Sequence, residues 1–178
     1  MADDTVIYPI GKWQLSAHYT RAELETLITS IEELPKKLRS LALLLTREQL
    51  QQSYREGAWS FCRLIHHIAD SHLNAYVKYK WALTETPCTV KPYDENAWSV
   101  LSDAADANVS ISLDLLDALH KRWVVSMRHE GVTHAEKTYY HPEMQRDFSV
   151  AQLIALYAWH GEHHYQQIFK HAVRNGWV

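Results

Sequence analysis

Hydrophobic residues recur every three or four positions in four long stretches of the chain, which is the spacing of the buried face of an amphipathic helix. The first stretch opens with the capping box Thr20-Arg21-Ala22-Glu23 and continues to residue 45. Pro35 lies inside this stretch. Because proline has no N–H to donate to the preceding turn, it predicts a kink or a break near residues 33–34.

The other three stretches also carry helix boundary signals. The second follows Ser60, a residue type that often caps helices, and covers residues 61–83. The third covers residues 110–128. The last opens with a second capping box, Ser149-Val150-Ala151-Gln152, and ends near Gly176, a residue type that often follows the last helical turn.

Four amphipathic helices of this length predict an all-α four-helix bundle, folded as a single domain over residues 1–178. A long loop joins the second and third helices and contains a predicted short helix at residues 95–101. This loop is long enough to cross the bundle, so a simple up-down-up-down order is not guaranteed. Residues 1–19 predict an extended lead-in, and the segment around Tyr139-Tyr140-His141-Pro142 predicts a short hairpin.

The composition excludes several classes of function. The net charge is −3 and like charges do not form runs, so a face for binding nucleic acid is not indicated. Apolar runs stay far below the roughly 20 residues of a membrane span, and the acidic start, Met1-Ala2-Asp3-Asp4, does not resemble a secretory signal. Without such a signal, the two cysteines, Cys62 and Cys88, predict reduced thiols and a cytoplasmic protein.

The segment His160-Gly161-Glu162-His163-His164 carries the most informative chemistry of the chain. His160 and His164 lie one helical turn apart, on the face that also carries Leu153. Two neutral imidazoles so placed can chelate one divalent cation, and a third ligand would leave a coordination position open. Alternatively, each is a core histidine with its own hydrogen bond. Unpaired, each would cost about 1–3 kcal/mol, and a shared ion resolves both.

The third ligand is expected from the histidines of the second helix. His72 lies closest to the centre of that helix's apolar face, whereas His67 lies on one flank and His66 on the opposite flank. Periodicity therefore leaves His72 and His67 nearly equal as candidates and ranks His66 last.

The segment from Trp59 to Asp70 resembles the signature of the DinB superfamily, in which a tryptophan and a serine precede a histidine. Other segments, in the same order, resemble its YfiT-like metal-dependent hydrolases: Tyr8-Pro9-Ile10-Gly11, Tyr54-Arg55-Glu56-Gly57, Lys91-Pro92-Tyr93-Asp94-Glu95, Tyr140-His141-Pro142-Glu143 and Trp159-His160. The resemblance covers nearly the whole chain. It implies a four-helix bundle with one zinc or nickel ion held by His67, His160 and His164, and often a homodimer.

Several further residues are expected near this site. Asp70 and Ser71 follow the family's signature histidine by one turn and could orient its second ring nitrogen, or could simply form a solvated helix face. His163 matches a further histidine of the family's last motif and is expected beside the site or at the surface. His141 could reach the open side of the ion or be only a loop histidine, and Tyr157 is expected to line the pocket.

The pattern favours a metal-dependent hydrolase that activates water at the open position and acts on a small-molecule substrate. The same position would ionise a bound thiol, so a thiol S-transferase that uses a low-molecular-weight thiol is the first alternative. A non-catalytic metal or small-molecule binding module is the second. The sequence does not place a carboxylate as general base.

Overall fold

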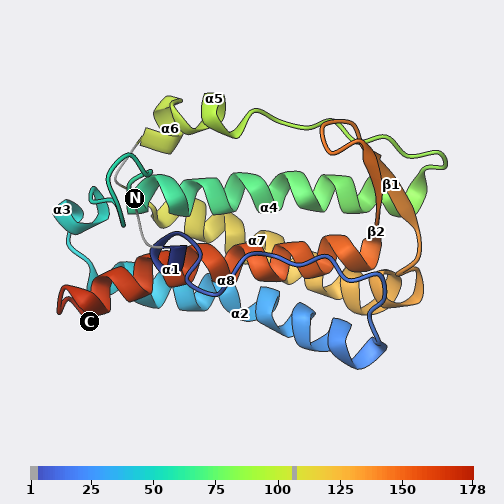
Figure 1. Cartoon of the computed structure of the whole chain (residues 1–178), viewed down its shortest axis with the longest axis horizontal. Coiled ribbons are helices and arrows are strands. Elements are labelled where there is room, and N and C mark those ends of the chain that lie inside the picture. The colour runs from blue at the N-terminus through green and yellow to red at the C-terminus, as the bar shows by residue number, and fades with distance from the viewer. Residues whose placement is uncertain (1–3, 106–107) are drawn as a thin grey trace.

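The computed structural model describes residues 4–105 and 108–178 and confirms the four-helix bundle. Its long helices are α2 (Arg21–Leu44), α4 (Phe61–Thr84), α7 (Ser110–Ser126) and α8 (Val150–Arg174). They lie side by side along the length of the molecule (Figure 1). A π-helical turn, η1 (Met127–Gly131), prolongs α7. Among the helices of this described part, none has both the length and the apolarity needed to span a bilayer.

The connection between α4 and α7 crosses the bundle, as its length allows. It returns along the outside of α4 and contains two short helices, α5 (Glu95–Ser99) and α6 (Ser102–Ala105). As a result α4 and α7 run in the same direction, and α2 and α8 run in the opposite one (Figure 1).

A hairpin of β1 (Thr138–His141) and β2 (Arg146–Ser149) precedes α8, as predicted from the sequence. Its register places Tyr139 opposite Phe148. The carbonyl of Cys88 accepts a hydrogen bond from the Tyr140 N–H, which ties the crossing loop to the hairpin.

Side-chain capping sets the starts of two of the four long helices, α2 and α8. The predicted capping boxes at Thr20 and Ser149 are both formed, and a third, at Thr46, starts the short helix α3 (Arg47–Leu50). Ser60 takes the N-cap position of α4, but its hydroxyl contacts the Cys62 sulfur at 3.1 Å instead of capping the helix.

The break predicted at Pro35 does not occur, and α2 is continuous from Arg21 to Leu44. A helical residue at position 35 would donate its N–H to the carbonyl of Ile31, and proline cannot. That carbonyl is instead paired with Nδ1 of His120 on α7, at 2.6 Å. Pro35 itself is buried, so the packing of α2 against the bundle holds the helix together across it.

The core consists of two hydrophobic clusters with a polar layer between them. One contains Tyr79, Trp123 and Leu153, and the other contains Phe61, Leu116 and Ile168. On α8 the histidines fall between the residues that belong to these two clusters, as does His72 on α4, whereas His66 and His67 lie one turn earlier, among residues of the second cluster; the α8 histidines are His160, His163 and His164. The polar layer therefore lies at mid-length in a bundle that is apolar on both sides of it.

The N-terminal segment packs along α8. Residues 8–19 form the predicted lead-in, but a short helix, α1 (Asp4–Ile7), precedes them. Four side chains of α8 donate hydrogen bonds to carbonyls of Ile7, Pro9, Gly11 and Ser16; the donors are Gln167, Lys170, Trp159 and Gln152. Residues 1–3, whose acidic character argued against a secretory signal, lie outside the described part.

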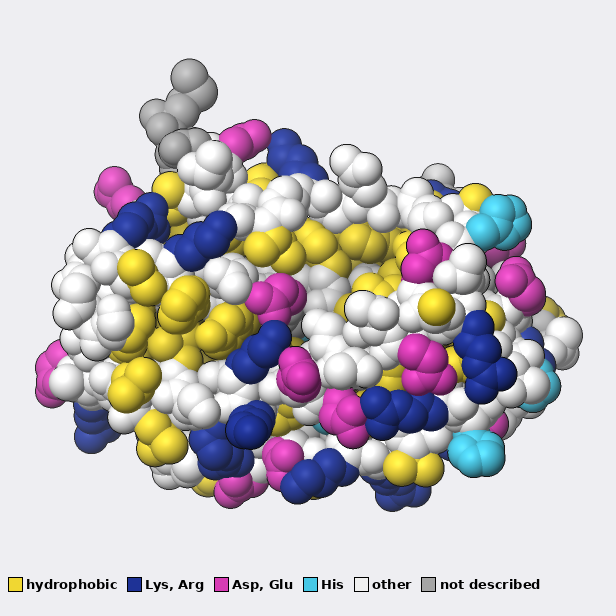
Figure 2. Space-filling model, turned by 90° about the horizontal axis from the view of Figure 1, so that it is seen from below, with side chains coloured by type: hydrophobic (Ala, Val, Ile, Leu, Met, Phe, Trp, Pro, Cys, Tyr) yellow, Lys and Arg dark blue, Asp and Glu magenta, His cyan; other side chains and the backbone are white. Residues whose placement is uncertain are grey.

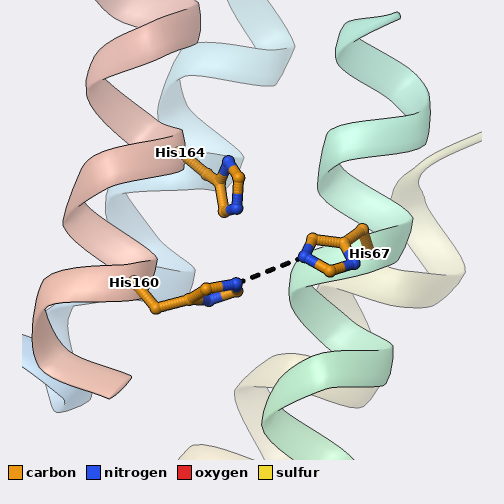
Figure 3. A group of neighbouring side chains, drawn as sticks. All are labelled: His67, His160 and His164. Carbon is orange, nitrogen blue, oxygen red and sulfur yellow. Dashed lines mark hydrogen bonds between the residues drawn. The ribbon is translucent and has the colours of Figure 1, made fainter. Parts of the chain in front are cut away.

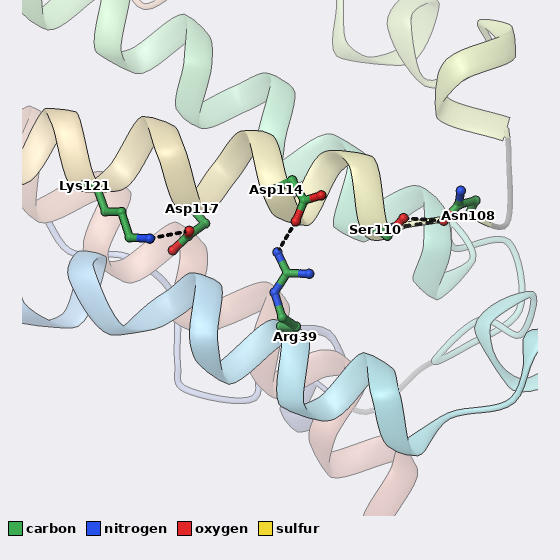
Figure 4. Close-up of polar contacts among 6 residues, drawn as sticks. All are labelled: Arg39, Asn108, Ser110, Asp114, Asp117 and Lys121. Atoms are coloured by element: carbon green, nitrogen blue, oxygen red, sulfur yellow. Dashed lines mark hydrogen bonds and ion pairs between the residues drawn. The ribbon is translucent and has the colours of Figure 1, made fainter.

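The exposed faces combine ion pairs with one hydrophobic region. Arg39 of α2 pairs with Asp114 of α7 at 2.6 Å, and Lys121 pairs with Asp117 within α7 (Figure 4). Such exposed pairs contribute at most about 1 kcal/mol each. Hydrophobic side chains gather near the end where α8 finishes (Figure 2), and a groove there is lined by Leu41, Leu44, Tyr165, Phe169 and Val178 among others. The homodimer stays a prediction.

Gly161 allows a close approach of α8 to α2. A Cβ at this position would lie 2.3 Å from the Cδ2 atom of Leu34, which is itself buried. We expect Gly161→Ala to destabilise the protein, because overpacking of about 1–3 kcal/mol exceeds the gain of about 1 kcal/mol in helix propensity. Urea unfolding measures the effect. In the Leu34→Ala background the same substitution should cost much less, and an equal cost in both backgrounds would contradict the steric explanation.

Candidate metal centre

His67 of α4 faces His160 and His164 of α8 across the space between these helices (Figure 3). The Nε2 atoms of His67 and His160 lie 3.2 Å apart. One ring nitrogen from each of the three histidines lies within 4.8 Å of the others. The structure thus brings together the three histidines that the sequence and the resemblance single out.

This arrangement fits a divalent cation. Zinc–nitrogen distances of 2.0–2.1 Å place two ligands of a tetrahedral site about 3.3 Å apart, close to the separation of 3.2 Å between His67 and His160. Three imidazole nitrogens also suit nickel. The donor set therefore agrees with both ions that the resemblance implies.

The three imidazoles are neutral near pH 7, as ligands must be. Burial, followed by repulsion from His164, lowers the pKa of His67 to about 3. Burial lowers the pKa of His164 to about 4, and it holds the pKa of His160 well below its ordinary value, with the neighbouring histidines adding to the effect. Each ring therefore has one nitrogen with a free lone pair.

His72, the rival candidate on α4, lies behind His160 and outside this group. Its Nε2 contacts His160 Nδ1 at 3.3 Å, and its Nδ1 contacts His120 Nε2 of α7 at 2.9 Å. His66 instead pairs through Nδ1 with the Ser112 hydroxyl at 2.7 Å. The centre of the apolar face of α4 points toward the middle of the bundle, where His72 lies. The three grouped histidines lie away from that centre, between α4 and α8.

The other predicted residues are distributed around the site. His163 stacks on Trp159 with ring centroids 4.6 Å apart, and its ring centroid lies 5.0 Å from that of His164. Asp70 lies near Asp103, and burial together with the Asp103 charge raises the pKa of its carboxyl. The predicted roles of Asp70 and Ser71 toward His67 stay predictions.

A cavity of about 590 Å³ opens beside His160. Ser71, His141 and Tyr157, all predicted near the site, line this cavity. So do groups of both charges: Lys78, Asp94, Glu95 and Glu143. Burial lowers the pKa of Lys78 and raises the pKa of Glu95, whose neighbours Asp94 and Glu143 raise it further. The cavity thus combines a buried amine with three carboxyl groups next to a candidate metal ligand.

Two residues of the site were missed by sequence reasoning. Gln167 accepts a hydrogen bond from His164 Nδ1 at 2.8 Å, and His120 pairs with His72. Both left a signal. Gln167 follows His164 by three residues on the same face of the last helix, and His120 falls on the apolar stripe of the third, four residues after Leu116.

Comparisons with known proteins agree with this geometry. The profile of the DinB superfamily matches residues 30–168. A protein of Oceanobacillus iheyensis named "Putative metal-dependent hydrolase" is 42% identical over 170 residues, which are 96% of this chain and 98% of that protein. "Putative metal-dependent hydrolase YfiT" of Bacillus subtilis is 36% identical over 177 residues, 99% of each chain.

The fold has an equally close counterpart among solved structures. The structure of YfiT from Bacillus subtilis, described as "a probable metal-dependent hydrolase with an unusual four-helix bundle topology", superimposes with a TM-score of 0.94 at 36% identity. The match covers 98% of this chain and 99% of that one. The chain described here belongs to the DinB superfamily, and its near relatives are the YfiT-like proteins.

Proposed function

We propose that the protein is a cytoplasmic metal-dependent hydrolase that acts on a small-molecule substrate, with one zinc or nickel ion held by His67, His160 and His164. The observation that carries this proposal is the convergence of three neutral imidazoles, one buried and two half-buried, beside a cavity that reaches His160. The names of the relatives agree with it.

The residues around the cavity have separable tasks. When bound, the ion supplies Lewis-acid chemistry that activates a water molecule as nucleophile and polarises the group under attack. The three imidazoles hold it without adding negative charge. Tyr157, which is buried, forms part of the wall between this chemistry and the core. Lys78 can donate hydrogen bonds to an anionic or carbonyl oxygen of the substrate, and Glu95 can accept one or take up a proton.

The cavity suits a small polar substrate. Its volume of about 590 Å³ is within the range of small-molecule sites. An amine and three carboxyl groups on its wall can pair with a substrate that carries both acceptors and donors.

Thiol S-transfer is the second candidate. Among the described residues, the group of possible metal ligands contains three histidines and no carboxylate. A hydrolase benefits from a general base beside its water, whereas a thiol that has ionised is already the nucleophilic form. A low-molecular-weight thiol would enter through the same cavity.

Removal of the ion tests whether it is catalytic or structural. We expect chelated protein to keep its helical circular dichroism, because two apolar clusters hold the bundle on either side of the histidines. Any activity found in a screen of hydrolytic substrates and of thiol–electrophile pairs should disappear. His164→Ala should lower it to the level of the chelated protein, a larger loss than the roughly 10- to 100-fold contributed by outer-shell partners.

The control is His129→Ala, which removes an exposed histidine and should leave activity unchanged. Activity that survives complete removal of the metal would refute the proposal. Tight metal binding without activity in either screen would instead favour a binding module.

Lys78 and Lys80 provide a matched pair for the cavity. Both lie on α4, but Lys78 is buried at the cavity and Lys80 is exposed. We expect Lys78→Met to raise KM for an oxygen-rich substrate by roughly 10-fold, the effect of losing one hydrogen bond to a charged group, with unchanged metal content. Lys80→Met should behave like the parent. Equal kinetics for Lys78→Met and the parent would exclude this cavity as the substrate site.

The neutral state of the ligands predicts a pH dependence of stability. The pKa of His67 is about 3 in the folded protein and about 6.5 when unfolded, so the unfolded chain binds more protons between these values. The free energy of unfolding of chelated protein should therefore fall as the pH drops from about 6.5 to 4. His67→Gln should reduce that slope by up to about 1.4 kcal/mol per pH unit. His129→Gln, at an exposed site, should leave that slope unchanged. Equal slopes for the two variants would show that folding does not lower the pKa of His67.

A further inference from the structure

Two of the three candidate ligands have their Nδ1 atoms engaged in hydrogen bonds that lead away from the site. His160 contacts His72, and His164 contacts Gln167. A neutral imidazole carries its hydrogen on one of its two nitrogens, and only the other nitrogen can bind a cation. The last acceptor in each chain of hydrogen bonds therefore determines which nitrogen of the histidine carries the hydrogen.

The chain that starts at His160 ends on a main-chain carbonyl. His120 Nδ1 lies 2.6 Å from the carbonyl oxygen of Ile31, and because a carbonyl can only accept, this nitrogen carries the hydrogen. In the neutral ring the Nε2 atom of His120 is then an acceptor, so the contact of 2.9 Å is donated by His72 Nδ1. By the same reasoning His72 Nε2 accepts from His160 Nδ1 at 3.3 Å.

The chain that starts at His164 ends in the same way. The Gln167 amide donates through Nε2 to the carbonyl of Ile7 at 2.9 Å. Its Oε1 atom therefore faces His164 and accepts the hydrogen of Nδ1 at 2.8 Å. The orientation of the amide is set by the carbonyl, since the reverse orientation would bring two oxygens together.

We propose that these two relays fix His160 and His164 in the tautomer whose Nε2 lone pair points into the metal site, which makes His72, His120 and Gln167 positioning residues for the metal ligands. This inference rests on the metal-binding part of the proposed function and not on the reaction. A hydrogen bond to Nδ1–H also raises the basicity of the ligating nitrogen.

The assignment gives His67 a different role from the other two histidines. Because His160 Nε2 has a lone pair, the contact of 3.2 Å between the two Nε2 atoms is donated by His67. A cation that binds between them can do so only after this hydrogen has moved to His67 Nδ1. His160 and His164 are thus ready to bind, and His67 alone must change tautomer.

The tautomers can be read directly in the parent protein. Long-range proton–nitrogen correlation spectra of protein with isotope-labelled histidine distinguish a ring protonated at Nδ1 from one protonated at Nε2. In metal-free protein we expect Nδ1–H for His160, His164, His72 and His120, and Nε2–H for His67. On titration with zinc, only His67 should change. An Nε2–H form of His160 or His164 in metal-free protein would overturn the proposal.

Substitutions test whether the relay acts on metal affinity. His120→Leu removes the donor to Ile31, whereas His120→Gln can still donate to a carbonyl and accept from a ring N–H, as Gln167 does in the other relay. We expect zinc binding of His120→Leu to weaken by roughly 10- to 100-fold and His120→Gln to recover most of the loss. Gln167→Leu should weaken binding by a similar factor through the second relay.

The control is His66→Leu, which removes a buried histidine of α4 that pairs with Ser112 and belongs to neither relay. Circular dichroism and thermal unfolding check that each variant is folded. If His120→Leu is folded and binds zinc as tightly as the parent, or if His66→Leu weakens binding equally, the relays are only core hydrogen bonds. These readouts do not involve activity, so they can refute the relays without refuting the proposed hydrolase function. An inactive protein with the expected tautomers would refute only the hydrolase function.

Discussion

The structure depends on how the bundle pairs the histidines at its mid-length, where hydrogen bonds join His72, His120, His160 and His164 but leave Nδ1 of His163 without a partner. Each buried ring nitrogen without a partner would cost about 1–3 kcal/mol, and a second proton on any ring would place a charge in the core. Imidazoles alone cannot resolve this, because a row of them needs an acceptor at one end to decide where every hydrogen lies. The carbonyls of Ile31 and Ile7 provide that end: Pro35 has no N–H to donate to Ile31, and Ile7 lies at the end of its helix.

The two carbonyls are freed by different local features of the chain. In α2, Pro35 removes the N–H that would have paired with Ile31 and leaves this carbonyl for His120. At the N-terminus, Ile7 is the last residue of α1, and the final carbonyls of a helix have no intrahelical donors. A residue that is unfavourable in a helix and a helix of only four residues thus both contribute to the candidate metal centre. The proline costs helix stability, and Leu34 and Leu38 beside it are buried in the core.

The sequence alone predicted those features that depend on residues close to one another along the chain. Apolar periodicity and capping boxes located the long helices, and the spacing of His160 and His164 placed both on one face. Hydrophobic periodicity could not distinguish His67 from His72, because it gives only the angle of each residue from the centre of the apolar face. Both histidines are buried, one beside α8 and the other deeper in the bundle. Only the family resemblance favoured His67.

The relays were out of reach for a related reason. Apart from the local contact of His164 with Gln167, their contacts join residues 48, 88, 89 and 160 positions apart, so they depend on how the helices are placed against one another. The N-terminal segment shows the same limit. Its composition predicts an extended lead-in, and nothing local indicates that a carbonyl at its start will accept a hydrogen bond from Gln167. Pro35 was noticed, but as a helix breaker, since its effect depends on a histidine of another helix.

The centre is therefore asymmetric in a way that suits a reactive site. On the side of the core, His160 and His164 are held by hydrogen bonds that end on fixed backbone atoms, so their rings can turn little without leaving buried groups unpaired. On the other side, His160 borders a cavity with a buried amine and carboxyl groups. The hydrogen-bonded rings of His160 and His164 would fix the position of an ion bound there. The cavity would give a substrate access to that ion. A purely structural ion needs neither the cavity nor its charged wall, and this combination is the physical reason to regard the histidine cluster as a site of reaction.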